Sequence, residues 1–159
     1  MIPVVKFYPL EKIPKESLVY VVIVAQCGEQ WVFCQHRDRT TWECPGGHVE
    51  PKEEPIAAAH RELYEETGAR TDELKEVCIY SVGFEQQEET FGLLCFARIE
   101  KVGELPENSE MESVRLFEKL PENWTYPHIQ PLLLEYVKKR LHEKALLCVG
   151  CAGNRDVLW

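Results

Sequence analysis

The segment spanning residues 46–69, GGHVEPKEEPIAAAHRELYEETGA, restricts the fold of this chain more than any other. Pro55 lies where the first turn of a helix tolerates proline, and Gly68 lies where helices commonly end. The residues between them are mostly Ala, Leu, Glu and Arg, which are good helix formers. The sequence therefore predicts a helix over about residues 54–67.

This predicted helix has two different faces. At 100° per residue, Glu62, Glu65 and Glu66 fall within one sector of about 100°. Ala59 and Leu63 lie in a second sector, which gives the helix an apolar stripe that can dock on a core. Like charges at these spacings repel by a few tenths of a kcal/mol per pair. The acidic sector is therefore either a solvated helix face or a set of carboxylates at the edge of a cleft.

The residues that flank the helix favour the cleft. Gly46 and Gly47 follow a proline and predict a tight turn, Glu53 stands just before the helix, and Arg61 can lie beside Glu65. Carboxylate oxygens together with backbone carbonyls form sites for hard divalent cations such as Mg²⁺. Magnesium bound in this way usually keeps water ligands and recruits substrate phosphates.

The same segment resembles the signature of the Nudix hydrolases, the MutT-like pyrophosphohydrolases, GX5EX7REUXEEXGU, where U is a bulky aliphatic residue. Eight positions match at the required spacing: Gly47, Glu53, Arg61, Glu62, Leu63, Glu65, Glu66 and Gly68. The one departure is Ala69 at the final aliphatic position, which thins the packing there but touches no chemistry. A match of this length is highly specific.

The resemblance implies an enzyme that acts on phosphorus anhydrides with Mg²⁺ or Mn²⁺ as its cofactor. It implies a metal-binding set made of the Gly46 carbonyl and three carboxylates, those of Glu62, Glu65 and Glu66. Glu62 is also the best candidate for orienting or deprotonating the attacking water, and Arg61 would fix the glutamates by a forked hydrogen bond. The expected catalytic residues are therefore Glu62, Arg61, Glu53 and Glu65, with Glu53 as a weaker base or a supporting carboxylate.

Two questions about the site stay open in the sequence. Some family members take the base from a later loop, where Glu110 and Glu112 stand, although both also fit solvated loop charges. Arg37 and Arg39 precede the helical segment in a polar loop and are either phosphate-binding residues or solvated charges. By resemblance to the family, Arg37 is the closer match.

Composition places limits on the partners. The 159 residues, 45% apolar and 28% charged, fit a single globular domain. A net charge of −9 argues against a nucleic-acid polymer as partner and leaves a small-molecule nucleotide, whose phosphates would arrive with the metal. The N-terminus does not fit a signal peptide and no apolar run reaches membrane length, so we expect a cytoplasmic protein without membrane contact. A monomer and a homodimer are equally compatible with the sequence.

Hydrophobic patterning predicts six strands and a second helix. The expected strands cover about residues 4–8, 18–25, 31–35, 76–84, 91–99 and 114–117, and the helix runs from Tyr126 and Pro127 to about Lys144. This order does not alternate as a doubly wound fold does, and it suits a mixed α+β sheet with a helix on each face. The resemblance implies the Nudix α/β/α sandwich. We assign residues 1–145 to this single domain and leave residues 146–159 as a tail of unknown structure.

The seven cysteines are odd in number and scattered through the expected strands, so most should be buried free thiols. Cys148 and Cys151 form an isolated CxxC that lacks the partners a zinc or redox site needs. Cys44 lies beside the glycine pair and permits a different chemistry, isomerisation of isopentenyl diphosphate, although burial explains this residue more simply.

The sequence therefore predicts hydrolysis of a diphosphate linkage in a nucleoside diphosphate derivative. The preferred substrate is a (deoxy)nucleoside triphosphate, possible oxidised forms included, which would yield a monophosphate and pyrophosphate. The alternatives are ADP-ribose or another nucleoside diphosphate linked to a second group, and a non-catalytic domain that senses nucleotides. Base recognition would fall to aromatic and amide side chains, with Phe84, Gln86, Gln87 and Trp124 as candidates.

Overall fold

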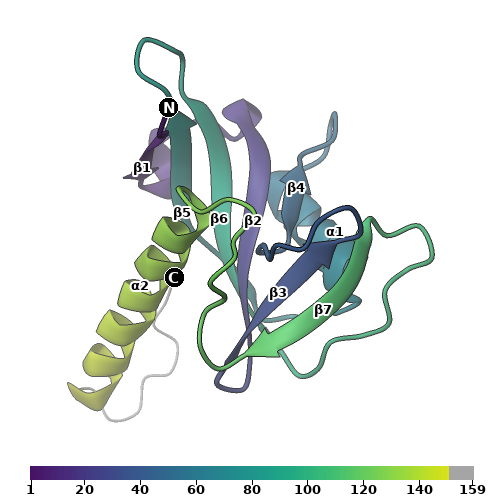
Figure 1. Cartoon of the computed structure of the whole chain (residues 1–159). Coiled ribbons are helices and arrows are strands. Elements are labelled where there is room, and N and C mark those ends of the chain that lie inside the picture. The colour runs from purple at the N-terminus through teal and green to yellow at the C-terminus, as the bar shows by residue number, and fades with distance from the viewer. Residues whose placement is uncertain (151–159) are drawn as a thin grey trace.

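The computed structural model describes residues 1–150 and shows one mixed sheet with a helix on each side (Figure 1). The strands are β1 (Val4–Tyr8), β2 (Leu18–Cys27), β3 (Gln30–His36), β4 (Gly46–His48), β5 (Leu74–Gly83), β6 (Thr90–Ile99) and β7 (Met111–Phe117). The helices are α1 (Pro55–Thr67) and α2 (Gln130–Gly150), and two 3₁₀ turns, η1 (Leu10–Lys12) and η2 (Lys15–Ser17), join β1 to β2. The six expected strands and both expected helices are confirmed.

The centre of the sheet is β2, which has partners on both edges. The strand order is β1-β5-β6-β2-β3-β7, with β2 and β6 parallel and the other pairs antiparallel. On its second edge β2 pairs with two strands in succession. Its residues Tyr20–Val22 pair with β4, and Ala25–Cys27 pair with β3. The sheet is therefore divided on this edge, with β3 and β4 diverging from a shared neighbour.

The glycine pair corrects one expectation. Gly46 and Gly47 do not form a tight turn but lie in β4, where they pair with Val22 and Val21. This short strand is not visible in the hydrophobic pattern because its residues have little or no apolar side chain. Pairing with β2 satisfies backbone groups that a buried turn would leave without partners.

Each face of the sheet carries its own hydrophobic core. The apolar stripe of α1, which includes Ala59 and Leu63, is fully buried against one face. Leu133, Leu134 and Val137 of α2 are buried against the other. Two helices that cover opposite faces of a mixed sheet make an α/β/α sandwich, which confirms the expected fold class.

The ends of α1 follow the sequence signals. Pro55 is its first residue, and Gly68 after its last residue adopts a left-handed φ of 73° while its amide donates to the Tyr64 carbonyl. A Cβ at Gly68 would collide with the backbone of Gly103 and Glu104, so the close approach of two chain segments also requires glycine here.

The second helix begins and ends later than expected, since α2 starts at Gln130 and continues to Gly150. The boundary expected at residue 145 therefore falls inside a helix.

The side chain of Cys148 and all of Cys151 lie outside the described residues. Of the five cysteines that the structure describes, four are buried, and all five are free. No helix within residues 1–150 is long and apolar enough to cross a membrane.

Candidate active site

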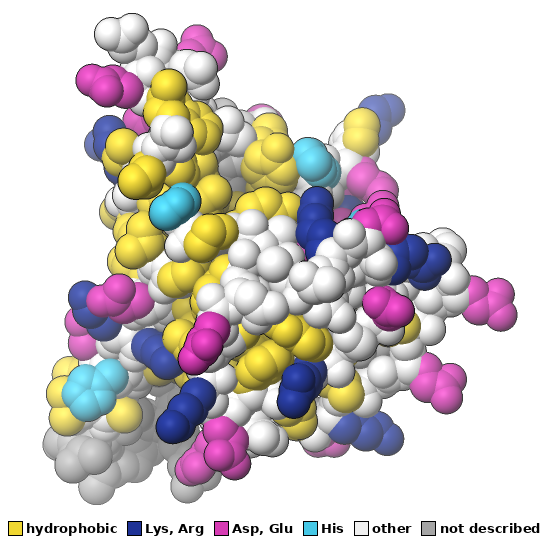
Figure 2. All heavy atoms as spheres, viewed as in Figure 1, with side chains coloured by type: hydrophobic (Ala, Val, Ile, Leu, Met, Phe, Trp, Pro, Cys, Tyr) yellow, Lys and Arg dark blue, Asp and Glu magenta, His cyan; other side chains and the backbone are white. Residues whose placement is uncertain are grey.

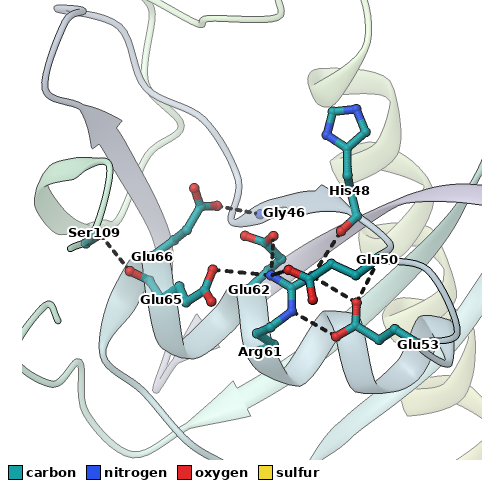
Figure 3. A network of polar contacts seen from close by, with 9 residues as sticks. All are labelled: Gly46, His48, Glu50, Glu53, Arg61, Glu62, Glu65, Glu66 and Ser109. Carbon is teal, nitrogen blue, oxygen red and sulfur yellow. Dashed lines mark hydrogen bonds and ion pairs between the residues drawn. The ribbon is translucent and has the colours of Figure 1, made fainter.

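Arg61 is the centre of a polar network that joins α1 to the segment before it (Figure 3). Its guanidinium donates to both oxygens of Glu53, from Nε at 2.8 Å and from Nη2 at 2.9 Å. It also donates to Glu62 at 2.9 Å, to Glu65 at 3.3 Å and to the His48 carbonyl at 3.0 Å. One planar cation therefore holds three glutamates and the end of β4 in a fixed arrangement.

The forked ion pair between Arg61 and Glu53 shifts the pKa values of both residues. Hydrogen bonds from the Arg61 guanidinium lower the pKa of Glu53, and the hydrogen bond to Glu53 raises the pKa of Arg61. Glu53 also accepts a hydrogen bond from the Glu50 amide. Its carboxylate is thus ionised and fully engaged with neighbours, as a structural support would be.

Glu62 occupies space that a side chain at position 47 would need. A Cβ built on Gly47 would collide with both carboxylate oxygens of Glu62. The carboxylate therefore lies directly over the backbone of β4, and glycine is required for that approach. Burial raises the pKa of Glu62, against the opposing effect of Arg61.

Glu66 is the most deeply placed carboxylate of the helix. The residue is only 7% exposed, and its Oε1 accepts a hydrogen bond of 2.8 Å from the Gly46 amide. Burial, together with the nearby charges of Glu62, Glu43 and Glu110, raises the pKa of Glu66 to about 9. Four carboxylates thus crowd one region that holds too few cations to balance them.

Glu65 differs from its neighbour although both were expected on one sector of the helix. Its side chain is 48% exposed, and its carboxylate contacts Arg61 only at 3.3 Å. Its backbone carbonyl accepts a hydrogen bond of 2.7 Å from the Ser109 hydroxyl, which ties α1 to the segment before β7.

A cavity of about 610 Å³ lies beside these carboxylates. Its polar wall comes from β4, α1 and the segments around β3 and β7, and includes Gly46, Gly47, Glu66, Glu43, Arg39, His36 and Glu110. Its apolar wall comes from β2, β5, the β5–β6 loop and the start of α2, and includes Val22, Tyr80, Val82, Phe84, Tyr126 and Ile129. Figure 2 shows the corresponding division of this face, with hydrophobic side chains gathered over β5, β6 and β2 and charged side chains toward β4 and β7. The volume suits a nucleotide-sized ligand.

The two loop arginines have different places. Arg39 lines the cavity and donates to Glu43 at 3.3 Å. Arg37 is not among the lining residues, and its guanidinium donates to the Ser109 carbonyl at 2.6 Å. Of the two late glutamates, Glu110 lines the cavity and Glu112 does not.

Of the four side chains expected to recognise the base, two line the cavity and two do not. Phe84 and Gln87 line the cavity, whereas Gln86 does not, and Trp124 packs against Phe33 in the α2-side core. Cys44 lines the cavity but is buried, and burial raises the pKa of its thiol, so this thiol stays protonated at neutral pH.

Several cavity residues were not singled out from the sequence. They are Tyr20, His36, Glu43, His48, Tyr80, Tyr126 and Gln130. Their residue types carry no signal by themselves, because tertiary contacts among β2, β3, β4, β5 and α2 bring them together. The spacing rules within one helix could not have found them.

The donor set of the site fits a hard divalent cation. Within residues 1–150 no three His, Cys, Asp or Glu side chains are already gathered closely enough to form a finished metal site. Glu62 and Glu66 nevertheless lie close enough to raise each other's energy when charged, and oxygen ligands of this kind suit Mg²⁺ or Mn²⁺. A cation among them would relieve the repulsion that now favours protonation of Glu66.

The fold and this acidic site together define an enzyme of the Nudix class. The NUDIX domain model matches residues 15–133, which is well over half of the chain. The chain therefore belongs to the Nudix family, as a hydrolase of that family.

Similar proteins agree with this assignment. The chain is 38% identical over 108 residues to a Bacillus subtilis protein named 8-oxo-dGTP diphosphatase YtkD, a name marked as provisional, and the match covers 68% of this chain and 67% of the relative. It is 34% identical over 91 residues to an RNA pyrophosphohydrolase of Bartonella henselae, with 52% of this chain and 53% of the relative covered. The chain thus spans about half the length of that second relative.

A solved structure gives the same result in three dimensions. The Bacillus subtilis pyrophosphohydrolase BsRppH, solved as a point mutant, superposes with a TM-score of 0.71 at 30% sequence identity, covering 86% of this chain and 90% of the other. A MutT NUDIX hydrolase from Burkholderia pseudomallei, at 20% identity and a TM-score of 0.62, shares the fold, and the match covers 76% of this chain and 97% of the other.

Proposed function

We propose that this enzyme hydrolyses a diphosphate linkage of a nucleoside triphosphate, releasing a nucleoside monophosphate and pyrophosphate, with Mg²⁺ or Mn²⁺ as cofactor. One observation carries the proposal. Two largely buried carboxylates, those of Glu62 and Glu66, crowd together without enough positive charge to balance them, and Glu66 lines a nucleotide-sized cavity. A triphosphate that arrives with divalent cations supplies that charge.

In this proposal Glu62, Glu65 and Glu66 hold the metal, with the Gly46 carbonyl as a further ligand. The bound cation would neutralise phosphate charge and help to activate water. Glu66 is already anchored by the Gly46 amide, and Glu62 is held by Arg61 against Gly47. These contacts place the carboxylates before any ligand binds, so little reorganisation is needed at the moment of reaction.

Arg61 acts as a positioning residue, and Glu53 supports it. The forked pair between them fixes the guanidinium, which in turn fixes Glu62 and Glu65. Arg39 is the better candidate for binding phosphate, since it lines the cavity while Arg37 is engaged with Ser109. Removal of Arg39 should raise the KM for a triphosphate more than it lowers kcat.

Glu62 and Glu110 are the two candidates for the base that accepts the proton of the attacking water. Glu62 is held by Arg61, and burial raises its pKa. Glu110 lines the cavity from the segment before β7, with a side chain that is 80% exposed and lies 4.0 Å from Nε2 of His36. Glu110→Gln would lower kcat by about 10²-fold or more if it is the base, and by much less otherwise.

A second substrate is favoured by one finding, the similarity to the RNA pyrophosphohydrolase of Bartonella henselae. Removal of pyrophosphate from a 5′-triphosphorylated RNA end cleaves the same bond as the reaction proposed above. The net charge of −9 weighs against long RNA contacts and favours the free nucleotide. ADP-ribose-type substrates and a purely nucleotide-sensing role are the remaining alternatives.

A substrate panel tests the proposal. The purified protein is incubated with Mg²⁺ or Mn²⁺ and nucleoside triphosphates, ADP-ribose or 5′-triphosphorylated oligonucleotides, and the products are separated. We expect monophosphate and pyrophosphate in equal amounts from triphosphates, and a loss of turnover in Glu66→Gln. Absence of turnover on every compound, or unchanged turnover in Glu66→Gln, would refute the proposal.

A further inference from the structure

His36 is the last residue of β3 and lies at a bulge in the pairing of β3 with β7. The register shifts between Gln35 and His36, and His36 faces Met111. The Arg37 amide donates to the Glu110 carbonyl at 3.1 Å, which joins the two segments beside the bulge. A bulge re-aims the side chains next to it. The side chain of His36 accordingly lines the cavity next to that of Glu110.

The backbone fixes which nitrogen of the His36 ring carries the proton. Nδ1 accepts a hydrogen bond of 3.1 Å from the Asp38 amide, two residues along the chain. A backbone N–H can only donate, so Nδ1 presents its lone pair and the proton of the neutral ring is on Nε2. The opposite tautomer would place two donors against each other and lose this hydrogen bond. The turn that follows His36 is closed by the Arg39 amide, which donates to the His36 carbonyl at 3.0 Å.

The Nε2–H donor of this ring faces the carboxylate of Glu110. Nε2 lies 4.0 Å from Oε2 of Glu110, while the Asp38 carboxylate lies on the other side, 3.9 Å from Nδ1. The His36 side chain is 20% exposed and that of Glu110 is 80% exposed, so the ring is the better fixed of the two groups. Hydrogen bonds used in catalysis are often long before substrate binds and shorten in the complex.

Glu110 needs such a partner because its neighbours repel it. Its charge is among those that raise the pKa values of Glu62 and Glu66, so the three carboxylates are close enough to interact. Among residues 1–150, His36 is the one basic side chain within 4.0 Å of the Glu110 carboxylate. Without this contact, electrostatic repulsion would favour a Glu110 side chain that points away from the cavity.

We propose that His36 is a positioning residue whose Nε2–H holds the Glu110 carboxylate at the cavity, in the orientation from which Glu110 accepts a proton during hydrolysis. This inference rests on the proposed function. The attacking water gives its proton to Glu110 as its oxygen bonds to phosphorus, and the P–O bond to the departing pyrophosphate breaks.

A neutral donor suits this task better than a cation. The Arg61 guanidinium lowers the pKa of Glu53 and so makes that carboxylate a weaker base. Arg61 acts in the same direction on Glu62, against the effect of burial. An imidazole N–H orients a carboxylate without adding a positive charge beside it, so the carboxylate keeps its affinity for a proton.

Two substitutions separate the roles of the two ring nitrogens. His36→Gln places an amide donor near the position of Nε2. His36→Asn reaches only as far as Nδ1 and can still accept from the Asp38 amide, as asparagine commonly does two residues along the chain. We expect kcat for a nucleoside triphosphate to fall by about tenfold in His36→Asn and by less than about threefold in His36→Gln, with KM nearly unchanged in both. His128→Asn, an exposed histidine outside the cavity lining, is the control and should keep the wild-type kcat.

A double-mutant cycle tests whether His36 acts through Glu110. The kcat values of the wild type, His36→Asn, Glu110→Gln and the double variant are compared. We expect His36→Asn to have no further effect once residue 110 is glutamine. An equal fall of kcat in both backgrounds, or a change confined to KM as for a phosphate-binding imidazole, would overturn the inference. A fall in His36→Gln as large as that in His36→Asn would overturn it too.

Nuclear magnetic resonance separates this inference from the proposed function. Long-range ¹H–¹⁵N spectra with Mg²⁺ present, at about pH 8 where an unperturbed imidazole is neutral, distinguish the two tautomers. The ring of His36 is identified by its absence from the spectrum of His36→Asn. We expect the Nε2–H tautomer, with an Nε2 shift that changes in Glu110→Gln. These signals without turnover of any triphosphate would support the contact and refute the hydrolysis. An Nδ1–H tautomer, or an Nε2 shift unchanged in Glu110→Gln, would overturn the inference whether or not nucleotides are hydrolysed.

Discussion

The carboxylate of Glu62 lies where a Cβ of residue 47 would otherwise stand. We therefore expect Gly47→Ala to push this carboxylate away from β4 and to lower kcat by about 10²-fold, because small displacements of catalytic groups are costly. Steady-state kinetics with a nucleoside triphosphate measures the effect. Gly83→Ala is the matched control, since a Cβ there would meet Glu89 only at 3.4 Å. Equal kcat values for the two variants would contradict the prediction.

Arg61→Lys keeps the positive charge but loses the fork that holds Glu53, Glu62 and Glu65 together. A lysine ammonium cannot reproduce two parallel hydrogen bonds to one carboxylate and a third to its neighbour. We expect kcat to fall by about 10²-fold and the midpoint of urea unfolding to decrease. Arg98→Lys, on an exposed side chain of β6, should change neither quantity appreciably. The role assigned to Arg61 fails if both variants behave alike.

Magnesium should stabilise the folded protein through Glu66. At about 10 to 100 times its dissociation constant, a ligand that binds only the folded state adds roughly 1.4–2.7 kcal/mol. Thermal unfolding with and without MgCl₂ should therefore show a higher Tm for the wild type and a much smaller rise for Glu66→Gln. Glu118→Gln, on an exposed side chain after β7, serves as the control and should respond like the wild type. An equal rise in Glu66→Gln would remove this residue from the metal site.

Glu53 makes stability depend on pH in a defined direction. Arg61 holds the pKa of this carboxyl below its usual value near 4.5, so the unfolded chain binds the proton more readily than the folded one. The pair therefore contributes stability above pH 4.5, and this contribution is lost as the pH falls through the lower folded pKa. Urea unfolding between about pH 3 and pH 6 should show a weaker pH dependence in Glu53→Gln than in the wild type.

The control for this measurement is the neighbouring residue. Glu54 is exposed and its side chain makes no capping hydrogen bond to α1, so Glu54→Gln should retain the wild-type slope. A parallel slope in Glu53→Gln would show that the Arg61 pair does not contribute in solution.

The sequence was sufficient to predict the parts of the site that lie within one helix and its flanks. Arg61, Glu62 and Glu65 are brought together by helical spacing alone, and the limits of α1 followed from Pro55 and Gly68. The difference between Glu65 and Glu66 was not predictable. Both belong to one sector of the helix, and only the docking of β4 buries the second while the first stays exposed.

The remainder of the cavity depends on contacts between distant segments. Gln130 meets Cys44 across 86 positions of sequence, and Arg39 rather than Arg37 reaches the cavity because Ser109 engages Arg37. Neither relation has a local pattern, since both depend on where α2 and the segment before β7 cross the sheet. The strand β4 was missed for a similar reason, because glycines carry no hydrophobic period.

The division of the sheet beside β2 explains how a helix on one face can serve a ligand on the other. A continuous sheet would separate α1 from α2, but β2 pairs with β4 along Tyr20–Val22 and with β3 along Ala25–Cys27 on the same edge. Glu66 of α1 and Gln130 of α2 both line the same cavity. Residues from both helix layers of the sandwich therefore line one cavity, so a ligand bound there would contact α1 and α2 at once.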